Sequence, residues 1–208
     1  MKYFLFSISV VLLSACTSYY KTMQPIAVNT TCSDTIKPPG IASAWFSISV
    51  DVMGKHISGL LLIKEMPDQF TRIVFTNEVG VTFFDFEFDR NGKFAVKKII
   101  SQLDRKPVLE TLRKDFYLLL GFPFQDEMQA WQHGDKLYFG VKEQSEQFYF
   151  TTSSGCTSLH SAEIGSARKR KVSVTFEGED MRHPEQVRIT HFTFDMTLEL
   201  KRLNKDAD

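Results

Sequence analysis

Apolar and polar residues alternate along most of the chain after Trp45, and this period of two predicts half-buried β-strands. In the first such segment, Phe46, Ile48 and Val50 alternate with polar neighbours. Turn signals such as Arg90-Asn91-Gly92 separate the segments. We therefore expect about nine or ten antiparallel strands. Nine of them lie at residues 45–52, 56–64, 72–76, 84–89, 94–100, 136–142, 147–152, 171–177 and 192–200.

The period changes between Asp104 and Leu120, where apolar residues recur at the spacing of one amphipathic helix. Asp104 is the expected N-terminal cap, Pro107 suits the first turn, and Gly121 is expected to end the helix. The apolar face of the helix carries Val108, Leu109, Leu112, Phe116, Leu119 and Leu120. We expect this face to lie on the sheet.

Strands and helices do not alternate along the chain, so a parallel sheet is excluded. The expected fold class is mainly β (α+β). A long antiparallel sheet with one apolar face curls, which predicts an incomplete β-barrel covered by one main helix.

The first residues predict a secretory leader, because Lys2 precedes an apolar run that is too short to span a bilayer. The run ends in Leu13-Ser14-Ala15-Cys16, which resembles a bacterial lipobox. The resemblance implies that residues 1–15 are removed and that Cys16 is lipidated. Residues 16–43 contain several prolines and no apolar stripe, so they are expected to form a flexible tether before a domain at 44–208. The absence of Asp after Cys16 implies, by the same resemblance, an outer-membrane protein facing the periplasm.

Two further cysteines, Cys32 and Cys156, remain after Cys16. An oxidising compartment allows a disulfide between them, but sequence does not give the distance that a bridge needs. A bridge and two unpaired thiols therefore both stay open. Neither cysteine belongs to a C-x-x-C pair, which argues against redox catalysis and against a cysteine zinc site.

Composition and motifs narrow the function classes. The 208 residues carry 25 Lys+Arg and 25 Asp+Glu, and this neutral balance argues against nucleic acid as the main partner. Phosphate-binding, dinucleotide and nucleophile-elbow motifs are missing, and the five His residues show no metal-ligand spacing. The carboxylates Asp85, Glu87 and Asp89 are interpreted as a solvated strand face. We expect no enzymatic activity, no cofactor and no metal.

Phenylalanine is unusually frequent, with 19 residues, and most of them fall on predicted inner faces. The sequence does not distinguish a tightly filled core from an apolar cavity between sheet and helix. If there is a cavity, its candidate lining residues are Phe46, Phe75, Phe84, Phe86, Leu112, Phe116, Phe139, Phe150 and Phe194.

The lipobox at Cys16, the run from Ser58 to Ile100 and the helix from about Asp104 to Leu120 together resemble the LolA/LolB superfamily of lipoprotein carriers. The lipid-anchored member, LolB, is the closer analogue. The resemblance implies an incomplete antiparallel barrel that holds acyl chains beneath helices. It also implies a protruding loop with an apolar tip, for which Glu65 to Phe70 is the candidate. The usual helix before the first strand is not predicted here.

Two functional hypotheses follow. In the first, a lipid-anchored, periplasm-facing lipoprotein binds acyl chains or another apolar ligand in the half-barrel, with lipoprotein localisation to the outer membrane as one form of that role. In the second, a structural or assembly lipoprotein has a filled core and acts through protein–protein contacts.

Overall fold

The computed structural model describes residues 20–203, apart from residues 29, 40, 42, 125–126, 144–145, 167–168 and 181–182. Within this part the strands form one 13-stranded sheet in which neighbouring strands pair antiparallel. The leader and Cys16 lie outside the described residues.

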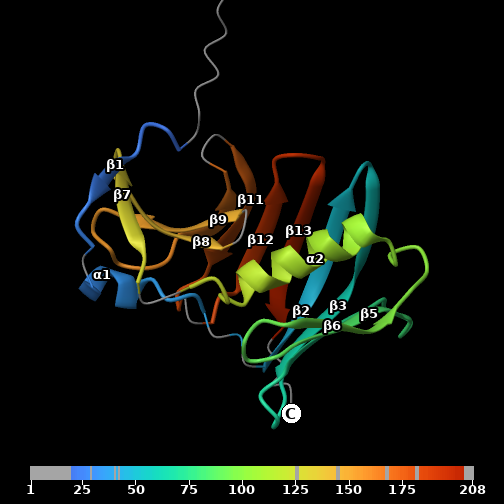
Figure 1. The fold of residues 1–208 in the computed structure, drawn as a ribbon. Helices are drawn as coiled ribbons and strands as arrows, with labels where there is room; N and C mark the ends of the chain where they lie inside the picture. The colour runs from blue at the N-terminus through green and yellow to red at the C-terminus, as the bar shows by residue number, and fades with distance from the viewer. Residues whose placement is uncertain are drawn as a thin grey trace, which may run out of the picture.

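Along the chain, one group of strands precedes the long helix and a second group follows it, and both groups belong to the same sheet (Figure 1). The first group consists of β2 (Ser43–Val52), β3 (Lys55–Glu65), β4 (Thr71–Thr76), β5 (Thr82–Phe88) and β6 (Phe94–Ile99). The helix is α2 (Lys106–Leu119). The second group consists of β7 (Gln129–His133), β8 (Lys136–Glu143), β9 (Glu146–Ser153), β10 (Ser161–Gly165), β11 (Arg170–Glu177), β12 (Gln186–His191) and β13 (Met196–Leu203).

Each group is a simple meander, and the two meanders join where β13 pairs with β2. In this register Leu198 lies opposite Val50. A short N-terminal strand, β1 (Gln24–Ile26), adds to β7, so β1 and β6 are the two ends of the strand order. The sheet is therefore open, and the expected curled antiparallel sheet with one main helix is confirmed.

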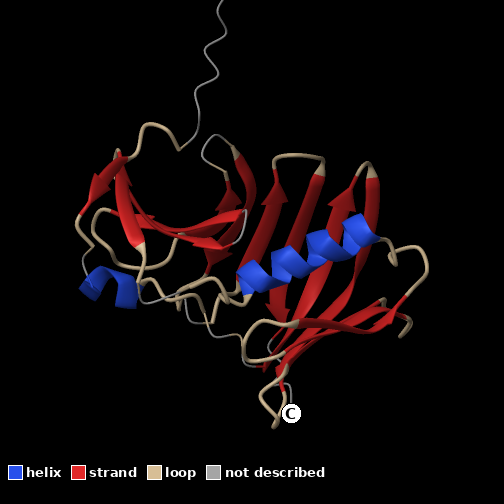
Figure 2. Ribbon diagram, viewed as in Figure 1, coloured by secondary structure: helices blue, strands red, loops and turns tan. Residues whose placement is uncertain are grey.

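The long helix lies across one face of the sheet (Figure 2). Its apolar spacing brings Phe116, Leu118 and Leu119 onto the sheet, where all three are fully buried. Gly121 ends the helix in the left-handed region at φ +75°, which a residue with a side chain rarely adopts. Of the described residues, neither helix is long and apolar enough to cross a membrane.

Three details differ from the sequence-based expectations. The N-cap residue of α2 is Arg105 rather than Asp104, and its side chain makes no capping hydrogen bond. The last strand starts at Met196, because the preceding residues form the turn from β12. Strands β1, β7, β10 and β12 were not predicted as separate strands. All four have six residues or fewer; β10 is buried along its whole length, whereas β12 alternates between more exposed and buried positions.

The predicted flexible tether is wrong for its described residues. The segment from Tyr20 to Ile41 contains β1 and a short helix, α1 (Thr30–Thr35), and it packs on the domain. Ile36 is fully buried and Ile41 nearly so. Prolines and the lack of an apolar stripe suggested a stalk, but a few well-spaced anchors are enough to hold an extended segment on a sheet.

Candidate functional site: an apolar cavity beneath the long helix

A cavity of about 390 Å³ lies between the sheet and the N-terminal half of α2. The floor is formed by β2, through Ile48, Val50 and Val52, and by the neighbouring strands on both sides. The helix contributes Val108, Thr111 and Leu112 to the roof. This volume lies in the usual range of small-molecule binding sites.

Local sequence pattern explains these positions. The alternation along β2 directs every second side chain toward the helix. On α2, positions 108, 111 and 112 follow the spacing of three and four residues that places side chains on one helix face. Leu112 is buried, whereas Val108 and Thr111 are only partly buried, because the cavity lies below them.

The cavity is chemically simple. Thr111 supplies the single polar side chain among its lining residues, and none of those residues is charged. Such a lining provides no acid, base or nucleophile–base pair. It favours hydrocarbon, because transfer of apolar surface out of water is favourable by about 25 cal/mol per Å².

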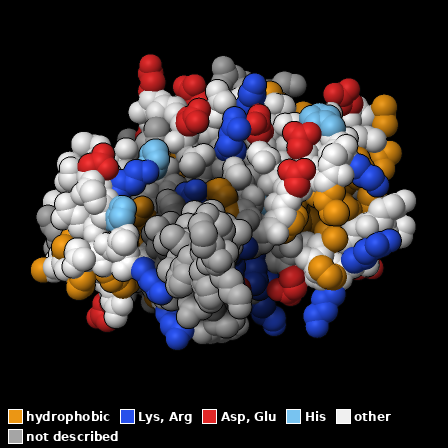
Figure 3. All heavy atoms as spheres, turned by 90° about the horizontal axis from the view of Figure 1, so that it is seen from above, with side chains coloured by type: hydrophobic (Ala, Val, Ile, Leu, Met, Phe, Trp, Pro, Cys, Tyr) orange, Lys and Arg blue, Asp and Glu red, His pale blue; other side chains and the backbone are white. Residues whose placement is uncertain are grey.

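The mouth of the cavity lies beside two turns. Met53, in the β2–β3 turn, is 78% exposed, and Phe194, in the β12–β13 turn, is 40% exposed, although both line the cavity. The backbone N–H of Met53 donates a hydrogen bond to the carbonyl oxygen of Asp195 at 3.0 Å, which joins the two turns. Seen from above, hydrophobic side chains gather on the side where β2, β3 and the start of α2 lie (Figure 3).

Four of the nine candidate lining residues line this cavity. They are Phe75, Phe84, Leu112 and Phe194.

The other five candidates are buried in the packed core and do not line the cavity. They are Phe46, Phe86, Phe116, Phe139 and Phe150, each 1% exposed or less. Stacking explains part of this: the rings of Phe84 and Phe86 are 4.2 Å apart, and Phe116 meets both edge-on.

Most of the lining was missed because it is aliphatic. The alternation of β2 placed Ile48, Val50 and Val52 on the buried face of the strand, and all three line the cavity. They were not among the candidates, because the candidates were chosen mainly from the phenylalanines. Met196 and Leu198 of β13 also line the cavity. The alternation of β2 and β13 was the available signal for all five.

A buried polar pair joins α2 to β12. Asp115 of α2 and His191 of β12 are hydrogen-bonded, with Oδ2 and Nε2 3.0 Å apart. Burial raises the pKa of Asp115, and the bond with His191 opposes that shift. The centre of the His191 ring also lies 4.7 Å from the centre of the Phe194 ring, so the pair is in contact with the β12–β13 turn.

A disulfide and a buried hydrogen bond tie the N-terminal segment to the domain, in addition to the pairing of β1 with β7. Cys32 and Cys156 form a disulfide, with Cα atoms 5.6 Å apart. The hydroxyl of Tyr20 donates a hydrogen bond to Glu163 at 2.8 Å, and its ring stacks on Tyr149. Burial raises the pKa of Tyr20, so the phenol stays protonated and remains a donor.

The carboxylates on β5 are engaged in ion pairs across the sheet surface. Arg72 donates two hydrogen bonds to Asp85, and Lys97 donates one to Glu87. Among the residues that the structure describes, no group of three or more His, Cys, Asp or Glu side chains is arranged to hold a metal ion.

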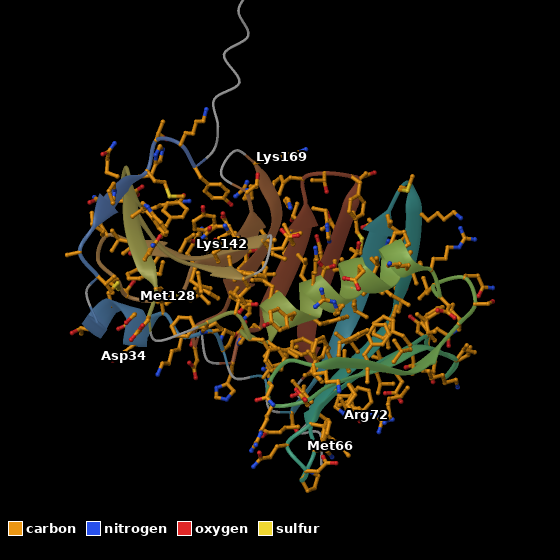
Figure 4. The ribbon with its side chains drawn as sticks, viewed as in Figure 1. Asp34, Met66, Arg72, Met128, Lys142 and Lys169 are labelled. Atoms are coloured by element: carbon orange, nitrogen blue, oxygen red, sulfur yellow. A yellow bond between two sulfur atoms is a disulfide. The ribbon has the colours of Figure 1, made fainter. Side chains whose placement is uncertain are left out.

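The candidate protruding loop does not present an exposed apolar tip. Met66 and Phe70 are both half-buried, and the backbone N–H of Met66 donates a hydrogen bond to Phe70 at 2.7 Å. The turn lies at the end of the molecule away from the β10–β11 turn, as the labels of Met66 and Lys169 show (Figure 4).

The solved structures that are similar to this chain include two with low sequence identity. One is a DUF1329 family protein from Desulfovibrio piger, with a TM-score of 0.44 and 10% identity over 84% of this chain and 87% of the other. The second, from Vibrio parahaemolyticus, is described as an outer membrane lipoprotein-sorting protein domain; its TM-score is 0.40 and its identity 6%, over 81% of this chain and 86% of the other. No protein-family model and no curated protein matches the sequence.

Proposed function

We propose that this protein is a lipid-anchored carrier that binds acyl chains, or an apolar ligand of similar shape, in the cavity beneath α2. The observation that carries the proposal is a lining of aliphatic and aromatic side chains without a charged group. The proposed anchor is Cys16, and the proposed location is the periplasmic face of the outer membrane. Binding without catalysis is part of the proposal.

Hydrocarbon burial supplies the driving force. Each methylene group that leaves water contributes about 0.8 kcal/mol, so about ten methylene groups supply the roughly 8 kcal/mol of micromolar binding, and the cost of association adds to the length of chain required. The cavity weighs against the filled-core alternative. Lipoprotein localisation is the form of this function that the LolA/LolB resemblance favours.

A matched pair of valine substitutions tests the proposal. Val108→Trp places a large side chain at the roof of the cavity, whereas Val79→Trp makes the same change in the β4–β5 turn, at a residue 84% exposed. The probe is dansyl-labelled undecanoate, titrated against the full chain carrying Cys16→Ser. Displacing about two methylene groups from the cavity weakens binding roughly tenfold.

We expect the Cys16→Ser chain and its Val79→Trp variant to bind the fluorescent probe with the same affinity. The tenfold loss of affinity should occur only in the Val108→Trp variant. Circular dichroism and urea midpoints establish that both variants are folded. No binding by the parent, or equal affinity in the two valine variants, would overturn the proposed site.

A further inference from the structure

Three exposed apolar side chains, Met53, Phe192 and Phe194, form a rim beside the cavity mouth. They come from the β2–β3 and β12–β13 turns, and they are 78%, 41% and 40% exposed. Two of the three also line the cavity. Isolated exposed apolar residues are ordinary in soluble proteins, but a group of them around an apolar opening indicates an interaction surface.

A continuous set of contacts connects this rim to the start of the described chain. Tyr20 and Arg170 both bind the carboxylate of Glu163, at 2.8 and 3.3 Å. The guanidinium of Arg170 lies over the ring of Phe192, 4.0 Å from its centre. The start of the described chain and the rim are thereby held on one side of the molecule, as the ribbon also shows (Figure 1).

The reach of the chain then limits the orientation of the domain. Tyr20 is four positions after Cys16, and four residues span at most about 14 Å. This step depends on the lipid anchor of the proposed function. A lipidated Cys16 holds the side of the domain around Tyr20 within that distance of the bilayer.

Charges of both signs lie near the rim: Asp51 and Asp195 are exposed beside Met53 and Phe194, and basic side chains are exposed nearer the start of the described chain. Lys21 follows Tyr20 and is exposed, and Lys169 in the β10–β11 turn is also exposed on the same side (Figure 4). Basic residues near an anionic membrane surface are attracted to it. The Met66–Asp68 turn, in contrast, lies at the opposite end of the molecule.

We propose that the rim docks onto the surface of a phospholipid bilayer, with Met53, Phe192 and Phe194 inserted among the lipid headgroups. The cavity mouth then opens against the membrane. An acyl chain passes between bilayer and cavity without crossing water, which removes most of the cost of exposing hydrocarbon.

A depth measurement with two labelled proteins tests the orientation. Phe192→Cys places an NBD fluorophore on the rim at a residue that does not line the cavity, and Asp68→Cys places the same fluorophore at the opposite end. Each lipid-anchored full chain is reconstituted into vesicles of phosphatidylethanolamine and phosphatidylglycerol. Some vesicles contain lipids with a nitroxide on the acyl chain, which quenches fluorophores that enter the bilayer.

We expect nitroxide lipids to cause a large loss of fluorescence and a blue shift for the label at position 192, with neither effect at position 68. Equal quenching at both positions, or stronger quenching at position 68, would overturn the docked orientation. Failure of the two proposals is distinguishable. If the Cys16→Ser chain binds the undecanoate probe but the label at position 192 stays in water, only the docking is refuted. If the label at position 192 is quenched but the Cys16→Ser chain binds no undecanoate probe, only the carrier function is refuted.

Discussion

Removing the disulfide between Cys32 and Cys156 should lower the free energy of unfolding by about 2–5 kcal/mol. The two cysteines are 124 residues apart, and the loop-closure relation assigns a loop of this length about 5 kcal/mol. The expected loss extends below that figure, because residual structure in the unfolded chain reduces the entropy that the bond removes.

Urea denaturation followed by circular dichroism measures the effect in a Cys32→Ala/Cys156→Ala variant. For a chain of this size, a slope of about 2–3 kcal/mol per M converts the expected loss into a midpoint lower by about 1–2 M. Adding a reductant to the native protein should reproduce the lower midpoint. The same reductant should leave the double variant unchanged, which shows that it acts on this bond alone.

An unchanged midpoint after reduction would refute the reasoning, because it would mean that the bond does not constrain the unfolded chain as a loop of 124 residues must. A loss confined to the N-terminal segment would also refute it. That result would appear as rapid proteolysis near α1 with the main urea transition unmoved.

Two further predictions concern the contacts of α2, one in the buried core and one in its ion pairs with the sheet. Phe116→Ala should lower the free energy of unfolding, measured by urea denaturation, by about 3–5 kcal/mol, since the ring is fully buried. Phe192→Ala on the rim should lower it by under about 1 kcal/mol. Equal losses in the two variants would contradict the assigned core. Burial favours a higher pKa for Glu146, but hydrogen bonds from Lys114 and Lys171 outweigh it and lower the pKa below 4.5. The stability from Glu146 is therefore present above pH 4.5 and lost as pH falls through the lowered pKa, so Glu146→Gln should cost about 1 kcal/mol at pH 7 and progressively less in acid. A cost independent of pH would exclude an ionic contribution.

Periodicity predicted the sheet well because it reports directly which face of a strand is buried. The alternation in β2 and the helical spacing in α2 were both readable, and their pairing into one layer of sheet and one helix followed from them. The distance between those layers was not readable, because the same pattern fits a filled and a hollow interior. Phe75 and Phe84 were among the candidate lining residues and do line the cavity. The aliphatic residues next to them in the lining were not among the candidates.

The N-terminal segment shows a different limit. Its attachment depends on a few long-range contacts, such as Tyr20 with Glu163 and Cys32 with Cys156. These contacts join positions more than 120 residues apart and leave no local period in the sequence. The sequence was compatible with the disulfide, but it gave no sign of the contacts that hold the expected tether against the domain.

The position of the cavity follows from where α2 is tied to the sheet. Lys114, Asp115 and Tyr117 bind Glu146, His191 and Glu143 respectively, at 2.6, 3.0 and 3.0 Å. All three bonds lie in the C-terminal half of the helix, which also carries the buried Phe116. The N-terminal half reaches over β2 with smaller, partly buried side chains such as Val108 and Thr111, so the space below it stays open. The bonds that fix the helix therefore lie toward its C-terminal end, and the helix residues that line the cavity lie toward its N-terminal end, so the same helix is held at one end and spans open space at the other.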